Sequence, residues 1–406
     1  MTTNYNANAL KIITEALSLI GADQGAGETL PAEDVDTCLD SLNMMVKAWQ
    51  AEGIGLWKNT DASLFLEYGE WLYSISSIGD HCTASSVKTE VATVAASGAT
   101  SLVIDATTGM TDSFDRNGIV TAITPAAAGA ITLTGALVDD GIATLPSQRK
   151  VLIYSTGNDS GVTLTITGQD VNGGSVTETI TGPNTTTVYS VYAYYTISSI
   201  TISGVGTGSI EIGCVGGFIG VELDDGTLQW TSIGGALSTT LTLIAALTDD
   251  VAVDNHVYVY ETKLPRPLEI CDARLRASDG NERSIVILSR QEYMNLSNKE
   301  DKGTVNLLYY DPQRTNGKLY VWQAGNNVQE YIKFTARMPI NDFNEQTDDP
   351  DFPQEWYLPL SWCLAVIVAP KFGKDLPTSF EGKALAFKIL ASQFDRDNTS
   401  IFLQVS

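Results

Sequence analysis

One stretch near the end of the chain decides the fold: Asp349-Pro350-Asp351-Phe352-Pro353-Gln354-Glu355-Trp356 leads into an apolar segment from Leu360 to Ala369 and then into Pro370-Lys371-Phe372-Gly373. The prolines favour an irregular, acidic lead-in, and the apolar segment has the length of a buried helix. The pattern therefore predicts a helix from about Gln354 to Ala369. A second C-terminal helix is predicted to begin at Thr378.

The helix at Thr378 carries a start signal and an apolar side. Glu381 follows Thr378 by three residues, the spacing of a capping box, in which each side chain accepts a bond from the other residue's backbone. We expect the buried side of this helix to contain Leu385, Phe387, Ile389, Leu390 and Phe394.

The N-terminus shows the same helical periodicity. Within residues 5–22 the apolar residues recur at spacings of three and four, and within 31–53 a second stripe follows Pro31, with acidic residues in the first turn where the helix dipole favours them. The two stripes are Leu10, Ile13, Leu17 and Ile20, and then Val35, Leu39, Leu42, Val46 and Trp49. Because each terminal pair alone would expose a long apolar stripe, we expect one four-helix body built from both chain ends.

Between the ends the periodicity changes to two, which is typical of strands. Val162, Leu164 and Ile166 alternate with polar residues, and Asn172-Gly173-Gly174 predicts the turn of a hairpin. A second hairpin is predicted across Gly204–Gly208, pairing Ile200 and Ile202 with Ile210 and Ile212. Farther on, Leu319–Trp322 and Tyr331–Phe334 are predicted to pair.

These patterns predict an α+β fold: a helical bundle built from both chain ends, with a large all-β, sandwich-like insertion in the middle. The expected divisions are a helical hairpin and strand pair at 1–79, a β-rich insertion at 80–260 with an Ig-like or sandwich module near 124–215, a β-rich continuation of the body at 261–353, a C-terminal helix pair at 354–396, and an extended tail at 397–406.

Composition narrows the class of protein. The chain has 406 residues and a net charge of -24, which disfavours ordinary nucleic-acid binding. Residues 80–260 hold seventeen acidic and four basic residues, so over half of the negative charge lies there. We expect no signal peptide, because no basic segment precedes an apolar one, and no membrane-spanning segment.

Motifs for catalysis or metal binding are missing from the sequence. His81 and His256 have no metal-ligand spacing, Gly204–Gly208 lacks the following helix of a dinucleotide site, and the acids at 348–351 lack EF-hand spacing. We therefore expect no catalytic residues, no metal and no cofactor. The cysteines are odd in number, have no CxxC spacing and are expected to be buried thiols: Cys38, Cys82, Cys214, Cys271 and Cys363.

A set of motifs in chain order carries a family resemblance. They are Leu42-Asn43-Met44-Met45-Val46-Lys47-Ala48-Trp49-Gln50-Ala51-Glu52-Gly53, the strand pair at 64–75, Arg266-Pro267-Leu268-Glu269-Ile270, Ser289-Arg290-Gln291-Glu292-Tyr293, the strand Tyr320–Trp322 and the segment 349–356. In this order they make the chain resemble the head-to-tail adaptors of short-tailed bacteriophages, the packaged-DNA-stabilisation or tail-accessory-factor family of P22-like viruses. The insertion at 80–260 departs from that pattern.

The resemblance implies a structural virion protein without enzymatic activity. Such an adaptor, or connector, is made in the host cytoplasm and forms a homo-oligomeric ring, expected to contain twelve copies, at the head-tail interface. The ring binds the portal protein, extends the DNA channel and docks tail nozzle or tail-fibre proteins, and packaged DNA passes through without sequence-specific binding. No membrane is involved.

The tail after the last helix is the expected portal contact. It turns apolar at Ile401, Phe402, Leu403 and Val405, and a short β-prone terminus can add a strand to the edge of a partner's sheet. Packing of the same residues on their own subunit is the alternative. Two other functions stay open: a peptidoglycan-degrading tail enzyme, and a receptor-binding or decoration protein.

Overall fold

The structure is a computed structural model that describes residues 5–22 and 30–394. Strands make up about 38% and helices about 19% of the chain, so the predicted α+β class is confirmed. The chain divides into two compact units, Met1–Thr60 with Arg337–Ser406, and Asp61–Ala336.

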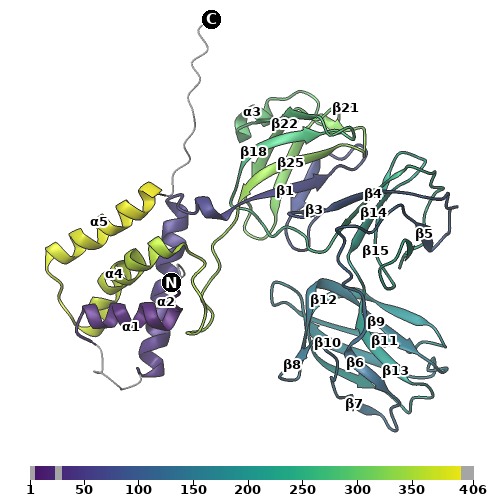
Figure 1. The fold of residues 1–406 in the computed structure, drawn as a ribbon, viewed down its shortest axis with the longest axis horizontal. Helices are drawn as coiled ribbons and strands as arrows, with labels where there is room; N and C mark the ends of the chain where they lie inside the picture. Colours follow the sequence, from purple (N-terminus) through teal and green to yellow (C-terminus); the bar gives the residue numbers. More distant parts are fainter. Residues whose placement is uncertain (1–4, 23–29, 395–406) are drawn as a thin grey trace, which may run out of the picture. The chain divides into compact units, whose positions relative to one another are not determined.

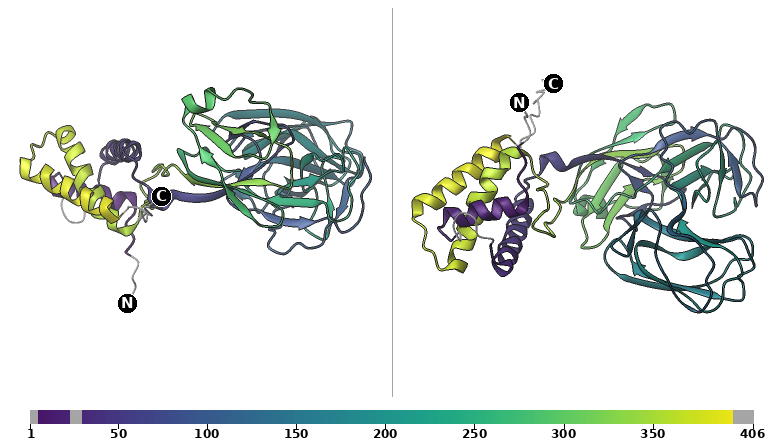
Figure 2. Two further views of the ribbon diagram at one scale, coloured as in Figure 1. Left: turned by 90° about the horizontal axis from the view of Figure 1, so that it is seen from above. Right: turned by 60° about the horizontal axis from the view of Figure 1, so that its bottom comes forward.

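The first unit contains the helices from both ends of the chain, which lie side by side in Figure 1 and remain together in both views of Figure 2. They are α1 (Ala9–Leu19), α2 (Ala32–Ala51), η1 (Leu56–Lys58), η2 (Gln354–Trp356), α4 (Tyr357–Val368), η3 (Ala369–Phe372) and α5 (Thr378–Phe394).

One hydrophobic core joins these helices. Helix α4 contacts α1, α2 and α5, and it buries Leu360, Leu364, Ala365 and Val368 almost completely. The same core takes Ile13 and Leu17 of α1, and Val35, Leu42, Val46 and Trp49 of α2, as their spacing predicts. Residues from the two chain ends therefore depend on each other for burial.

Helix starts differ in detail from the sequence prediction. Asn8 caps α1 by accepting a hydrogen bond from the backbone N of Lys11 at 3.0 Å. Helix α5 already includes Thr378, so the residue before it is Pro377, whose side chain has no acceptor. The capping box in the structure is formed instead by Ser289 and Glu292, at the start of α3 (Arg290–Met294) in the second unit.

The predicted buried side of α5 is largely wrong. Leu385, Ile389 and Leu390 are exposed, whereas Ala384 and Ala391 are buried. The reason is that α5 meets α4 through small residues and two aromatic rings, Phe380 and Phe387, which lie against Trp362. Apolar residues occur on both sides of α5, so periodicity alone does not identify the inner side. The side chain of Phe394 lies outside the described residues.

The second unit consists of sheets and the short helix α3. Around residues 115–214 lies an eight-stranded sheet ordered β11-β10-β12-β9-β13-β6, with β7 paired to β12 and β8 to β9. Its strands are β6 (Asp115–Ile123), β7 (Gly129–Ile131), β8 (Val138–Asp139), β9 (Ile142–Ser155), β10 (Thr163–Gln169), β11 (Ser175–Thr181), β12 (Thr187–Ile202) and β13 (Ile210–Cys214). They enclose a hydrophobic core of their own.

Two smaller sheets share a separate core. Their orders are β15-β14-β17-β4 and β16-β5. The strands are β4 (Val87–Glu90), β5 (Ser101–Val103), β14 (Phe218–Glu222), β15 (Leu228–Ser232), β16 (Thr240–Thr242) and β17 (His256–Tyr260).

The remaining strands form three sheets, ordered β19-β18-β25-β1-β3, β2-β23-β22-β20 and β21-β24. They are β1 (Asn59–Phe65), β2 (Leu72–Ile75), β3 (Cys82–Thr83), β18 (Glu269–Arg276), β19 (Glu282–Ser284), β20 (Val286–Ile287), β21 (Lys302–Gly303), β22 (Leu307–Asp311), β23 (Gly317–Trp322), β24 (Ala324–Gly325) and β25 (Tyr331–Arg337).

Of the predicted strand pairs, the first hairpin is confirmed. Strands β10 and β11 pair antiparallel, with Gly173 at φ 80° in the turn. The second hairpin is wrong, because the long strand β9 lies between β12 and β13 and pairs with both. The pairing of 319–322 with 331–334 is also wrong, since β23 pairs with β2 and β22 while β25 lies in another sheet.

The boundaries of the two compact units differ from the domain boundaries that the sequence predicts. The boundary at residues 60 and 61 separates the N-terminal helices from β2, and the segment 261–336 belongs with the sheets and not with the helices. The strands within 64–75 lie in different sheets, so they do not form a pair. Apart from β3, their partners in the sheets are strands far along the chain, which local sequence does not signal.

Replacing Trp356 by Ala should destabilise the first unit strongly. Trp356 has an exposed fraction of 0% in the shared core, and truncation of a buried tryptophan costs about 3–5 kcal/mol. Urea unfolding followed by circular dichroism at 222 nm, where helices dominate, measures the loss. Leu390→Ala, at a residue that is 63% exposed in the same unit, is the control and should leave the midpoint of the monomer unchanged. An unchanged midpoint for Trp356→Ala would contradict the shared core.

Candidate functional site

The acidic lead-in at 348–351 is occupied by bonds within the first unit. The Asp351 carboxylate accepts hydrogen bonds from Lys58 Nζ at 2.6 Å and from the backbone N of Asn341 at 3.1 Å. Its backbone oxygen accepts a bond from Trp57 Nε1 at 3.0 Å. Asp348 accepts bonds from the backbone of Asn344 and Glu345. Asp348 and Asp351 therefore anchor the chain, and Asp348 and Asp349 also line an open pocket of ≈ 560 Å³.

Aromatic rings lock the same segment onto the N-terminal helices. The Trp356 ring lies with its centroid 5.5 Å from Trp49 and 5.6 Å from Trp57, and Phe352 lies 5.2 Å from Trp57. Such tilted contacts add to the burial of large apolar area. The lead-in thus positions α4, and no group of three or more metal-ligating side chains occurs in the described residues.

His81 is held in an aromatic cluster of the second unit. Its ring stacks on Trp230 with centroids 3.9 Å apart and planes at 2°, and its Nδ1 lies 2.6 Å from Tyr260 Oη. Burial, helped by the Lys263 ammonium, lowers the pKa of His81 to about 2. Burial also raises the pKa of Tyr260 well above its usual range. Both groups are therefore neutral at physiological pH.

A pocket of ≈ 310 Å³ adjoins this cluster. Its lining combines aromatic rings and hydroxyls with two cations, Lys150 and Lys263. The lining residues are His81, Lys150, Phe218, Trp230, Thr231, Ser232, Ile244, Ala245 and Lys263. Lys263 Nζ donates to the Gly79 carbonyl and lies over the Phe218 ring, and burial lowers its pKa. In the described part of the chain, no hydrogen bond joins a pocket hydroxyl to His81, so no nucleophile is paired with a base there.

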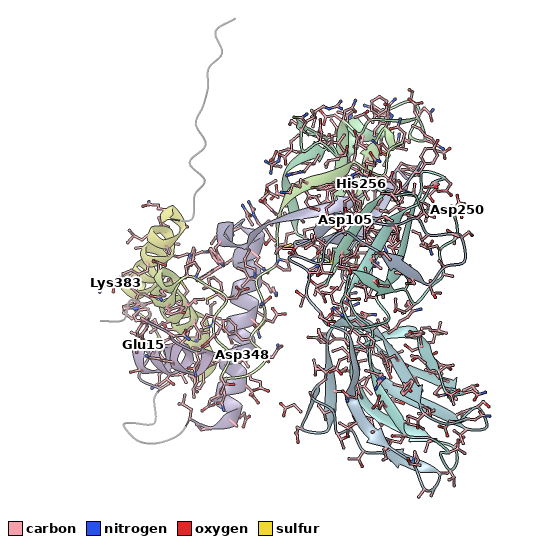
Figure 3. The ribbon with its side chains drawn as sticks, turned by 45° about the vertical axis from the view of Figure 1, so that its right-hand side comes forward. Glu15, Asp105, Asp250, His256, Asp348 and Lys383 are labelled. Carbon is pink, nitrogen blue, oxygen red and sulfur yellow. The ribbon has the colours of Figure 1, made fainter. Side chains whose placement is uncertain are left out.

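His256 lies between two carboxylates. Glu222 Oε2 accepts a hydrogen bond from the His256 backbone N at 2.9 Å and lies 3.0 Å from its Nδ1, while Glu90 lies 3.8 Å from Nε2. Gln329 donates to the other oxygen of Glu222 at 2.8 Å. Burial raises the pKa of Glu222, but these bonds outweigh it and hold the pKa below its usual value. Figure 3 places His256 among the strands of the second unit. The bonds of Glu222 to His256 and Gln329 hold these segments together.

The glycine-rich loop 204–208 is bound by Asp159. The Asp159 carboxylate accepts bonds from the backbone N of Thr207 at 2.6 Å and of Gly208 at 3.3 Å. A side chain at Gly208 would collide with the backbone of Gly157, which explains why glycine stands at both positions. The loop therefore closes one end of the large sheet and, as the sequence indicated, has no following helix to bind a phosphate.

The residues expected to contact a portal, Ile401, Phe402, Leu403 and Val405, lie outside the described residues. The expectation of buried cysteines holds for Cys38, Cys82 and Cys214, whereas Cys363 is half-buried and Cys271 is exposed. None of the helices in the described ranges is long and apolar enough to cross a membrane.

A comparison with known proteins finds no match: no protein-family model, no curated protein and no solved structure is similar to this chain.

His81 should resist protonation and make the second unit sensitive to acid. Its pKa is about 2 in the folded chain and about 6.5 when unfolded, so the unfolded state binds more protons between these values. The contribution of neutral His81 to the free energy of unfolding is therefore fully present above pH 6.5 and decreases as the pH is lowered. Between pH 6.5 and 5 the loss should reach about 2 kcal/mol.

Titration of the imidazole signals by NMR from pH 7 to 5 measures this directly, and His81 should show no protonation. Tyr260→Phe is the matched control variant. It keeps the His81 ring buried and removes only the hydroxyl that contacts His81 Nδ1, so it separates the effect of burial on the pKa from the effect of this bond. An imidazole of His81 that titrates near pH 6.5 in the folded protein would refute the assignment.

Proposed function

We propose that the chain is a structural virion protein, a head-to-tail adaptor that assembles into a ring of twelve copies beneath a portal and extends its DNA channel. In this proposal the helices of the first unit form a four-helix bundle that assembles the ring. The sheets of the second unit form the lobes that meet further tail proteins, with a sandwich-like module near 124–215.

The observation that carries the proposal is the dependence of α1 and α2 on α4. The family motifs at 42–53 and 349–356 lie at opposite ends of the sequence, and their aromatic residues Trp49 and Trp356 meet at 5.5 Å in one core. A body of this kind tolerates a large insertion, because the intervening chain only has to leave and return. The resemblance of the motifs in chain order supports the same assignment.

The side chains of the second unit support a structural function more than a catalytic one. Three polar residues with shifted pKa values are engaged with neighbours: Asp159 binds a loop, Glu222 binds His256, and Lys263 binds a carbonyl. Their bonds stabilise the fold where a catalyst would leave a reactive atom facing a substrate. A zymogram on peptidoglycan tests the enzymatic alternative, and a cleared band would favour it.

The charge distribution suits a channel whose wall does not bind the DNA that passes through it. A ring would repeat the acidic segment 80–260 in every copy, and like charges repel phosphates within a Debye length of about 8 Å at physiological salt. DNA would then pass without sequence-specific binding.

Removing residues 397–406 should weaken binding to the portal protein of the same virus and leave the fold intact. The deleted segment contains the apolar residues 401–403 and 405, which suit strand addition to a partner. Negative-stain imaging of the full chain with the portal should show a twelve-fold ring, and circular dichroism of the truncated chain should be unchanged.

The matched control for this deletion replaces the four apolar residues by serine in the full-length chain. Both variants should lose portal binding to a similar extent. Full binding by both would reject the tail as the contact, and a wild-type chain that never binds the portal would reject the adaptor function itself.

A further inference from the structure

Helix α5 is apolar on its outer side as well as its inner side. Leu385 is 56% exposed, Ile389 is 46% exposed and Leu390 is 63% exposed, and Ala386 between them is exposed too. A helix that is apolar all round is typical of a fully buried position. Among the described residues, nothing covers the outer side of α5.

The inner side of α5 is already satisfied. Ala384 and Ala391 are buried, and the Trp362 ring of α4 stacks on Phe380 at 4.5 Å and meets Phe387 at 5.3 Å. At the flank, Lys388 pairs with Glu52 at 2.7 Å. The four outer residues take no part in these contacts, so rotation of α5 would expose one apolar side in exchange for the other.

Helix α2 has an outer face that begins with acidic residues and continues with apolar ones. Its first turns expose Glu33, Asp36 and Asp40, and Met44 follows in the same row at 62% exposed. Positions 36, 40, 44 and 48 are spaced by four, so they lie along one line of the helix. This line passes from acidic to apolar, ending in the small residues Ala48 and Ala51, which are also exposed.

The outer face of α5 has a matching order. Lys383, labelled in Figure 3, is exposed about one turn before the apolar residues and has no ion-pair partner in the described chain. Lys383 precedes the centre of the apolar residues by roughly 7 Å of helix, and Asp40 precedes the midpoint of Met44 and Ala48 by roughly 9 Å. Parallel packing would therefore bring Lys383 beside Asp40 while the apolar halves meet.

We propose that the outer face of α5 (Leu385, Ala386, Ile389, Leu390) docks onto the outer face of α2 (Asp36, Asp40, Met44, Ala48) of a second copy of this chain. The occupant is a second copy because the same molecule presents both complementary faces. This inference rests on the proposed function and names its subunit interface. Since the two faces differ, the contact is heterologous, and repeated heterologous contacts form a ring when the rotation between neighbouring subunits closes.

Cysteine pairs test the contact in the full-length protein. In a Cys271→Ser background, which removes the exposed native thiol, one batch carries Met44→Cys and another carries Ile389→Cys. Mixing the two under mild oxidation should give a disulfide-linked dimer on a non-reducing gel. Each batch alone should remain largely uncrosslinked, because a heterologous contact does not bring identical residues together.

Charge reversal provides the matched control. Lys383→Glu or Asp40→Lys alone should raise the dissociation constant of self-association about 2–5-fold, the range of an exposed ion pair, and the double variant should restore it. Ile389→Glu should raise the constant at least about tenfold, as loss of a central apolar contact does. Because all these residues are exposed, the thermal unfolding midpoint of the monomer should not change.

The outcomes separate this interface from the adaptor proposal. Oligomers that form on the portal but ignore all these substitutions, or a dominant Ile389→Cys self-crosslink, would overturn the interface while leaving the adaptor function in place. A wild-type chain that stays monomeric at high concentration and with the portal would overturn both.

Discussion

The burial of α4 between helices from the other end of the chain is the interaction on which the structure depends. Trp356 and Leu360 reach the core only because α1 and α2 supply its other walls. Neither pair of terminal helices could bury its apolar side alone, so the first unit forms only when both ends are present. The bond between Lys58 and Asp351, at 2.6 Å, fixes the register in which they meet.

Because the helices from both chain ends pack together, many strands can be accommodated between them in the sequence. The chain leaves the helices through β1 and returns through β25, and these strands are neighbours in one sheet. The two connections are therefore held side by side by backbone hydrogen bonds. Inside that frame the sheet around 115–214 keeps its own core, so its sequence can vary without affecting the helices.

The sequence predicted those parts in which local pattern determines structure. Helices α1, α2 and α4 were found because their buried residues repeat at helical spacing, and the β10–β11 hairpin because its turn is short. The pairing of β12 and β13 failed because β9, from earlier in the chain, inserts between them. Periodicity likewise could not show which side of α5 is buried, because both sides are apolar. His81 and Tyr260 meet across 179 residues, and no spacing signals such a contact.

The failure at α5 is itself informative about function. Three of the apolar residues that periodicity assigns to its buried side, Leu385, Ile389 and Leu390, are exposed. Exposed apolar residues gathered on one helix are typical of a contact surface, and they are the reason why we propose that a second copy docks there. The sheets give a weaker argument of this kind: Asp159 and Glu222 are bonded to neighbours within the unit, whereas Tyr194 Oη and Trp230 Nε1 are buried without a hydrogen-bond partner among the described residues. Assembly through the helices, with the sheets left free for other partners, is the arrangement that we propose on these grounds.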